Sequence, residues 1–142
     1  MKSLNAFILS LRTFSAYAST KPQDQKDVLD ISFDGRRISL VNDNGHCALA
    51  RSDDSLLRLD VNWPCQFSQT FLRKAVLENY RSATIFMVQH SNRVVPPDTH
   101  CTTDLQAIRY FKGNVELAPV HKVERCSIRR WDQKIFVGQF DW

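Results

Sequence analysis

The sequence predicts an α+β domain built on a mostly antiparallel sheet, with one main helix packed on it and two disulfides cross-linking it. Three observations support this prediction: apolar and polar residues alternate in short segments, turn dipeptides such as Asp34-Gly35 separate the segments, and four cysteines are spread along the chain. The 142 residues are enough for one hydrophobic core. We therefore expect a single domain over residues 28–142.

The first half of this domain is expected to form a meander of four short strands. Apolar residues alternate with polar ones from 29 to 40 around the Asp34-Gly35 turn, which predicts a hairpin. Further turns at 42–45 and 52–54 separate the next two strands. Pro64 ends the series, because proline cannot donate a hydrogen bond to a strand ladder.

The second half is expected to contain the main helix and the rest of the sheet. Ser68 can cap a helix over about 69–80, in which apolar residues recur at helical spacing. Residues 84–88, TIFMV, are apolar on both faces and predict a central strand that this helix covers on one side. The remaining expected strands are 105–111, 114–117, 120–126 and 134–140.

The N-terminal residues predict export. A positively charged start is followed by a mostly apolar stretch at 4–11, and Ala16-Tyr17-Ala18 ends in the small residues of a cleavage site. Residues 1–18 are therefore expected to be a signal peptide, followed by a polar linker over 19–27. Arg12 interrupts the apolar stretch, so an uncleaved amphipathic helix on a cytoplasmic protein is the alternative. No membrane span is expected in the mature chain.

The cysteines favour a periplasmic or secreted location. Their number is even and their spacing is wide, without the periodicity of metal ligands, which is typical of two disulfides. Spacing alone allows three connectivities, and the pairing of nearer partners is preferred because shorter loops close more easily. The alternative is four buried, reduced thiols. The preferred pairs are Cys47 with Cys65 and Cys101 with Cys126.

Several kinds of site are not expected in this chain. The glycines lie at least ten residues apart, so no dinucleotide, P-loop or nucleophile-elbow motif can be written. Two His-Cys dipeptides, His46-Cys47 and His100-Cys101, raise the possibility of zinc. Adjacent residues on a strand point to opposite faces, however, so neither dipeptide can readily supply two ligands to one ion. We expect no metal and no cofactor.

A small secreted hydrolase of the ribonuclease type is the enzymatic alternative. It would draw a general acid and a general base from His90, His100 and His121, with Lys122 or Arg125 stabilising a developing phosphate charge. The spacing of these histidines is not diagnostic of catalysis. Binding is therefore expected rather than catalysis.

The expected function is binding to another protein, in the manner of an inhibitor or an immunity-type factor. The long polar segment 90–104 and the basic C-terminal strands suggest the contact surface, with the terminal tryptophan as an aromatic anchor. Arginines that alternate with aromatic residues in those strands make nucleic-acid binding a further alternative. The residues expected in the contact surface are His90, Asn92, Arg93, Asp98, His100, Arg125, Arg129, Arg130, Trp131 and Trp142.

Overall fold

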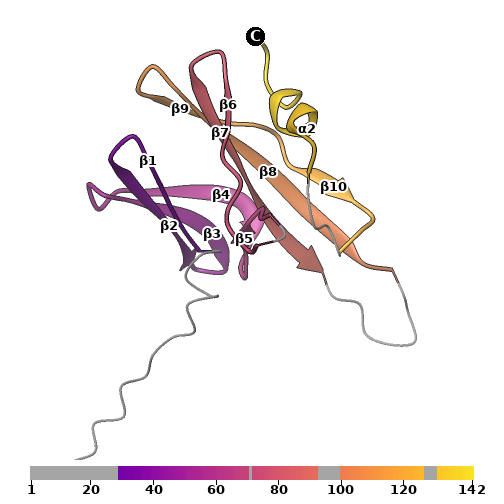
Figure 1. Ribbon diagram of the computed structural model, residues 1–142. Coiled ribbons are helices and arrows are strands. Elements are labelled where there is room, and N and C mark those ends of the chain that lie inside the picture. Colours follow the sequence, from indigo (N-terminus) through magenta and orange to yellow (C-terminus); the bar gives the residue numbers. More distant parts are fainter. Residues whose placement is uncertain (1–28, 71, 93–99, 127–130) are drawn as a thin grey trace, which may run out of the picture.

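Two antiparallel sheets face each other, and a short C-terminal helix lies on the outer face of the second sheet (Figure 1). This arrangement comes from a computed structural model, which describes residues 29–70, 72–92, 100–126 and 131–142. The expected sheet-rich class with mostly antiparallel pairing is confirmed. The expected signal peptide and linker, residues 1–27, lie outside the described residues.

The first sheet is a four-stranded meander, as the turn pattern predicts. Its strands follow chain order, and residues with positive φ at the connecting turns, such as Gly35 at 69° and Gly45 at 89°, provide the backbone that tight hairpins require. Every strand is antiparallel to its neighbour. The strands are β1 (Asp30–Phe33), β2 (Arg36–Asp43), β3 (His46–Arg51) and β4 (Leu56–Asn62).

The second sheet is built around two ten-residue strands that pair along their length. β7 (Ala83–Asn92) pairs with β8 (Thr102–Phe111), and its residues 83–89 are buried, so the expected central strand is confirmed. The shorter strands flank this pair: β5 and β6 on β7, and β9 and β10 on β8. Their bounds are β5 (Gln66–Phe67), β6 (Glu78–Tyr80), β9 (Asn114–Leu117) and β10 (His121–Val123).

The expected main helix over 69–80 is wrong. Leu72, which the helical pattern places on the buried face, is 77% exposed. The residues after it alternate in the manner of a strand: Ala75 and Leu77 pack on one core and Val76 packs on the other. Pairing of β6 with the long strand β7 satisfies the backbone of this segment and prevails over its helical spacing.

The strand expected at 134–140 is also wrong, because this segment begins with the helix α2 (Gln133–Val137). The side chain of Asp132 caps this helix by accepting a hydrogen bond from the backbone of Lys134. Phe136, on the helix, is fully buried against the second sheet. The cap and this single apolar anchor determine the local structure, rather than the alternation of the sequence.

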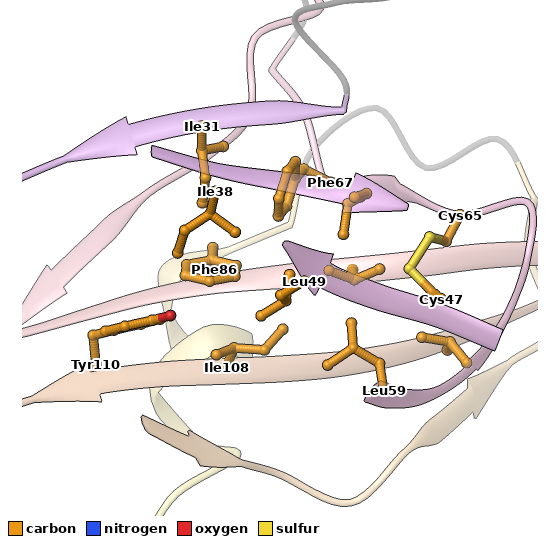
Figure 2. Close-up of a cluster of buried hydrophobic side chains, with 13 residues drawn as sticks. Ile31, Ile38, Cys47, Leu49, Leu59, Cys65, Phe67, Phe86, Ile108 and Tyr110 are labelled. Carbon is orange, nitrogen blue, oxygen red and sulfur yellow. A yellow bond between two sulfur atoms is a disulfide. The ribbon is translucent and has the colours of Figure 1, made fainter. Parts of the chain in front are cut away.

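Two cores hold the layers together. The larger one lies between the sheets and contains side chains from both, with the Cys47–Cys65 disulfide at one end and Tyr110 at the other (Figure 2). The smaller one lies between the second sheet and α2. Burial of such apolar side chains stabilises a fold by roughly 1.5–3 kcal/mol each.

Both preferred cysteine pairings are confirmed. Cys47 on β3 is bonded to Cys65 just before β5, which links the first sheet to the second, with Cα atoms 6.1 Å apart. Cys101 is bonded to Cys126, with Cα atoms 5.4 Å apart, and joins the chain at the start of β8 to the chain after β10.

Candidate functional site

A pocket with a volume of about 320 Å³ opens at the end of the two-sheet stack where the β1–β2, β3–β4 and β8–β9 turns meet. Both sheets contribute to it. The first sheet and its turn supply cations and one carboxylate, and the second sheet supplies a phenol and an apolar side chain. We call it the arginine pocket and define it by Arg36, Ile38, Arg51, Asp53, Tyr110 and Val115.

Strand geometry aims two arginines into this pocket. Alternate residues of a strand share a face, and Ile38 of β2 and Leu49 of β3 face the inter-sheet core. Arg36 lies two residues before Ile38 on β2, and Arg51 lies two residues after Leu49 on β3. Both arginines are therefore on the core-facing side of their strands. Arg51 pairs with Ile38 across the strands, so Arg36 is the diagonal neighbour of Arg51. Backbone positions related in this way lie about 7–8 Å apart.

Neither of these arginines forms an ion pair with any residue that the structure describes. The Nε atom of Arg51 is buried and lacks a hydrogen-bond partner within the described ranges. The guanidinium of Arg36 lies 5.6 Å from the centre of the Tyr110 ring, a cation–π distance. Arg37, at the rim, differs because its guanidinium lies 3.8 Å from Asp30. The pocket therefore presents two positive charges that no described carboxylate pairs with.

The carboxylate already present, on Asp53, is committed to its own turn. It accepts a hydrogen bond from the hydroxyl of Ser55 and another, of 3.0 Å, from the Ser55 backbone N–H. These hydrogen bonds, the hydroxyl first, lower the pKa of Asp53 below its usual value, and the nearby charge of Arg51 adds to the effect. Asp53 thus stays ionised at the pocket mouth without a hydrogen bond to Arg51.

Tyr110 forms the second sheet's side of the pocket and is only 7% exposed. Its ring packs on Phe33 and Phe86, at centroid distances of 5.1 Å and 5.9 Å. Its hydroxyl is buried and finds no hydrogen-bond partner in the described part of the chain. Burial raises the pKa of Tyr110 above its ordinary value, outweighing the opposing charges of Arg51 and Arg36. Burial therefore disfavours the phenolate form of Tyr110 at this wall of the pocket.

The surface expected from the sequence lies elsewhere. His90, which pairs with Asp104 across the strands, and Asn92 lie at the far end of β7 from the pocket, near the Cys101–Cys126 disulfide. Asp104 and Tyr110 are six residues apart on β8, so roughly 20 Å separate the two ends. His100 and Arg125 flank the same disulfide. The expected residues outside the described ranges are Arg93, Asp98, Arg129 and Arg130.

His90 and His121 are not placed together as an acid–base pair. Both ring nitrogens of His90 are engaged, Nδ1 at 2.6 Å from the Pro64 carbonyl oxygen and Nε2 at 3.0 Å from the Asn92 side-chain oxygen. On β8, Asp104 pairs with His90 whereas the next residue pairs with His121, so the two histidines project from opposite faces of the second sheet. Within the described ranges, no three potential metal ligands cluster.

The two expected tryptophans make contacts within the chain. Trp142 is 43% exposed, and its ring lies 4.6 Å from the Arg109 guanidinium and 4.8 Å from the Tyr80 ring. Its indole N–H donates a hydrogen bond of 2.8 Å to the Val137 carbonyl. Trp131 is partly buried against the second core. Part of the Trp142 surface is therefore already covered by its own chain.

The arginine pocket is not among the sites expected from the sequence, although a signal for it is present. The alternation that predicts β2 and β3 continues for one more step, to Arg36 and Arg51 at positions in phase with the buried residues. A charged residue in a core-facing phase marks either a strand end or a site. That both arginines belong to one pocket depends on strand register, which spacing alone does not provide.

Comparison of the chain with known protein families, curated proteins and solved structures finds no match. In the described ranges, no helix reaches the length and apolar content that crossing a bilayer requires. The function is therefore inferred from the site itself.

Proposed function

We propose that this protein is an exported, periplasmic or secreted, binding protein whose arginine pocket recognises an anionic group on its target. The target is another protein, which the chain binds in the manner of an inhibitor or an immunity-type factor. The disulfides Cys47–Cys65 and Cys101–Cys126 support export, because such bonds persist in oxidising compartments.

The unpaired state of Arg36 and Arg51 carries the proposal of anion binding. A buried donor without a partner lowers the stability of a folded protein by roughly 1–3 kcal/mol, so the Nε of Arg51 destabilises the free protein. A ligand anion would instead pair with the guanidinium groups of Arg36 and Arg51, which no described carboxylate pairs with, because a guanidinium presents its donors in the fork that carboxylates and phosphates match. Such arginines act well as anchors at protein interfaces.

The alternatives have less support. Both ring nitrogens of His90 are engaged, and His90 and His121 project from opposite faces of the second sheet. These two histidines therefore do not supply the acid and the base of a hydrolase. Nucleic-acid binding requires a row of available cations along a groove. Arg109 on β8, one of the arginines next to aromatic residues, is instead engaged by Glu116 and by the Asp141 carbonyl oxygen.

Anion binding is tested by thermal unfolding of the oxidised protein with acetate, sulfate or phosphate at constant ionic strength. A ligand that binds only the folded state raises its stability by RT ln(1 + [L]/Kd). We expect at least one anion to raise the unfolding temperature of the native protein and of the control variant Arg58→Met, but not that of Arg51→Met. Arg58 is an exposed arginine of β4 outside the pocket. Equal responses in all three proteins, or none in any, would overturn the proposal.

Export is tested separately by the intact mass of the protein recovered from outside the cytoplasm. We expect the mass of residues 19–142 less four hydrogens, one pair for each disulfide. A full-length chain with four free thiols would contradict export.

A further inference from the structure

The charge balance of the arginine pocket selects the charge of its ligand. Three arginines and one aspartate line the cavity, and one of the arginines, Arg37, is directed to Asp30. Arg36 and Arg51 then face the single charge of Asp53, which leaves an excess of one positive charge. A monoanion neutralises that excess, whereas a dianion such as a phosphate monoester leaves a negative charge beside the buried Tyr110.

The walls of the pocket select the body of the ligand. Ile38, the Tyr110 ring and Val115 form the apolar part of the lining, with Ile38 paired to Arg51 across the strands and the Tyr110 ring beneath the Arg36 guanidinium. Tyr110 and Val115 are paired across β8 and β9, so they present one continuous surface. A volume of about 320 Å³ holds about ten water molecules, far more than one small inorganic anion displaces. The space fits an anionic group that brings an apolar stem with it.

The two cations can hold a planar carboxylate head group. A guanidinium binds a carboxylate through two parallel N–H···O hydrogen bonds, which specify orientation as well as charge. Arg51 and Arg36 both line the pocket, and their diagonal placement on β3 and β2 lets both guanidinium groups contact one head group. Asp53, which already neutralises part of this charge at the pocket mouth, is itself a carboxylate.

We infer that the arginine pocket takes a monocarboxylate carried on an apolar stem, with Arg51 and Arg36 holding the carboxylate and Ile38, Tyr110 and Val115 contacting the stem. This inference rests on the proposed function and specifies its ligand. Two sources carry this chemistry: an acidic side chain of a partner protein, and a free organic acid.

Titration calorimetry of the oxidised protein at constant ionic strength tests the inference. The probes are 4-methylpentanoate, its uncharged amide and inorganic phosphate. We expect the acid to bind more tightly than phosphate and the amide to show no binding. Affinity for the acid should fall about tenfold or more in Arg51→Met and stay unchanged in Arg58→Met. Arg51→Lys keeps the charge without the fork and should recover only part of the affinity.

The source is distinguished by a blocked Leu-Glu-Leu peptide and its Leu-Gln-Leu counterpart. Tighter binding of the glutamate peptide than of 4-methylpentanoate supports a partner's acidic side chain, and the reverse order supports a free acid. Equal binding of acid and amide, or tighter binding of phosphate, overturns the inference. Tighter phosphate binding that is lost in Arg51→Met still leaves anion binding standing. Failure of every anion to bind removes the proposed function as well.

Discussion

Replacing Arg51 with methionine should make the unliganded protein more stable. Methionine keeps an unbranched apolar stem beside Ile38 but removes the buried Nε donor that lacks a partner. The lower end of the cost of such a donor, about 1 kcal/mol, applies because Arg51 as a whole is only partly buried. Removal of the charge also relieves repulsion from Arg36, the diagonal neighbour of Arg51, which adds to the gain. Loss of attraction to Asp53 offsets part of this gain.

The expected net result is an increase of about 1 kcal/mol in the free energy of unfolding, or roughly 4 °C in the unfolding temperature. It should be measured by urea denaturation with the disulfides intact, because guanidinium chloride would screen the charges involved. The matched control is Arg58→Met, which removes an exposed arginine that lies 3.1 Å from Asp43 and should leave stability unchanged or lower it by up to about 1 kcal/mol. A loss of about 1 kcal/mol or more in Arg51→Met would refute the reasoning, because Arg51 would then be a structural residue.

Three further variants test the buried contacts of the fold, one of them at the pocket. Tyr110→Phe keeps the ring contacts and removes an unpartnered buried hydroxyl, so stability should rise by about 1 kcal/mol in urea denaturation. Because burial raises the pKa of Tyr110, the native protein should also lose stability as the pH rises above about 10, and Tyr110→Phe should lose less; parallel alkaline profiles would contradict this. Gln106→Leu should lower the free energy of unfolding by about 2 kcal/mol, because the Gln106 side chain accepts a hydrogen bond of 2.8 Å from the Asp60 N–H and donates one of 3.1 Å to the Ala118 carbonyl. An unchanged free energy of unfolding would show that water replaces the amide side chain. Converting Cys47 and Cys65 together to alanine should cost about 3 kcal/mol, and an unchanged urea midpoint would show that this bridge does not constrain the unfolded chain.

Local sequence signals predict the strands well where turn chemistry and alternation agree. The meander of β1 to β4 follows from its turns, because asparagine, aspartate and glycine tolerate the positive φ that those turns need. The disulfide pairs also follow, since each closes a short loop of 18 or 25 residues. These features depend on residues that are near one another in the chain.

The failures occur where tertiary pairing decides between two local patterns. Residues 69–80 contain apolar residues at helical spacing, but the last three of them pair with β7 as a strand. Leu72, which a helix would bury, is exposed, so its position in the helical pattern does not reflect burial in the core. At the C-terminus the sequence does carry the correct signal, Asp132 before the helix and Gly138 after it, although the alternation over 134–140 suggests a strand. Capping residues were the better guide there.

The arginine pocket could be predicted only in part. The core-facing phase of Arg36 and Arg51 can be read from each strand separately. That Tyr110 from the second sheet closes the same pocket follows from the packing of the two sheets, which no spacing in the sequence specifies. The length and polarity of segment 90–104 predict a functional loop, whereas the pocket is formed at short turns whose sequence predicts only the connection of two strands.

The most direct test of the account is the arginine Nε–H region of the ¹H–¹⁵N NMR spectrum, recorded while 4-methylpentanoate is added. We predict that the Nε–H signals of Arg51 and Arg36 shift with saturation, while the signal of Arg58 does not move. The uncharged amide should leave all three unchanged. Signals of Arg51 and Arg36 that stay fixed, or that move no more than that of Arg58, would contradict carboxylate binding in this pocket.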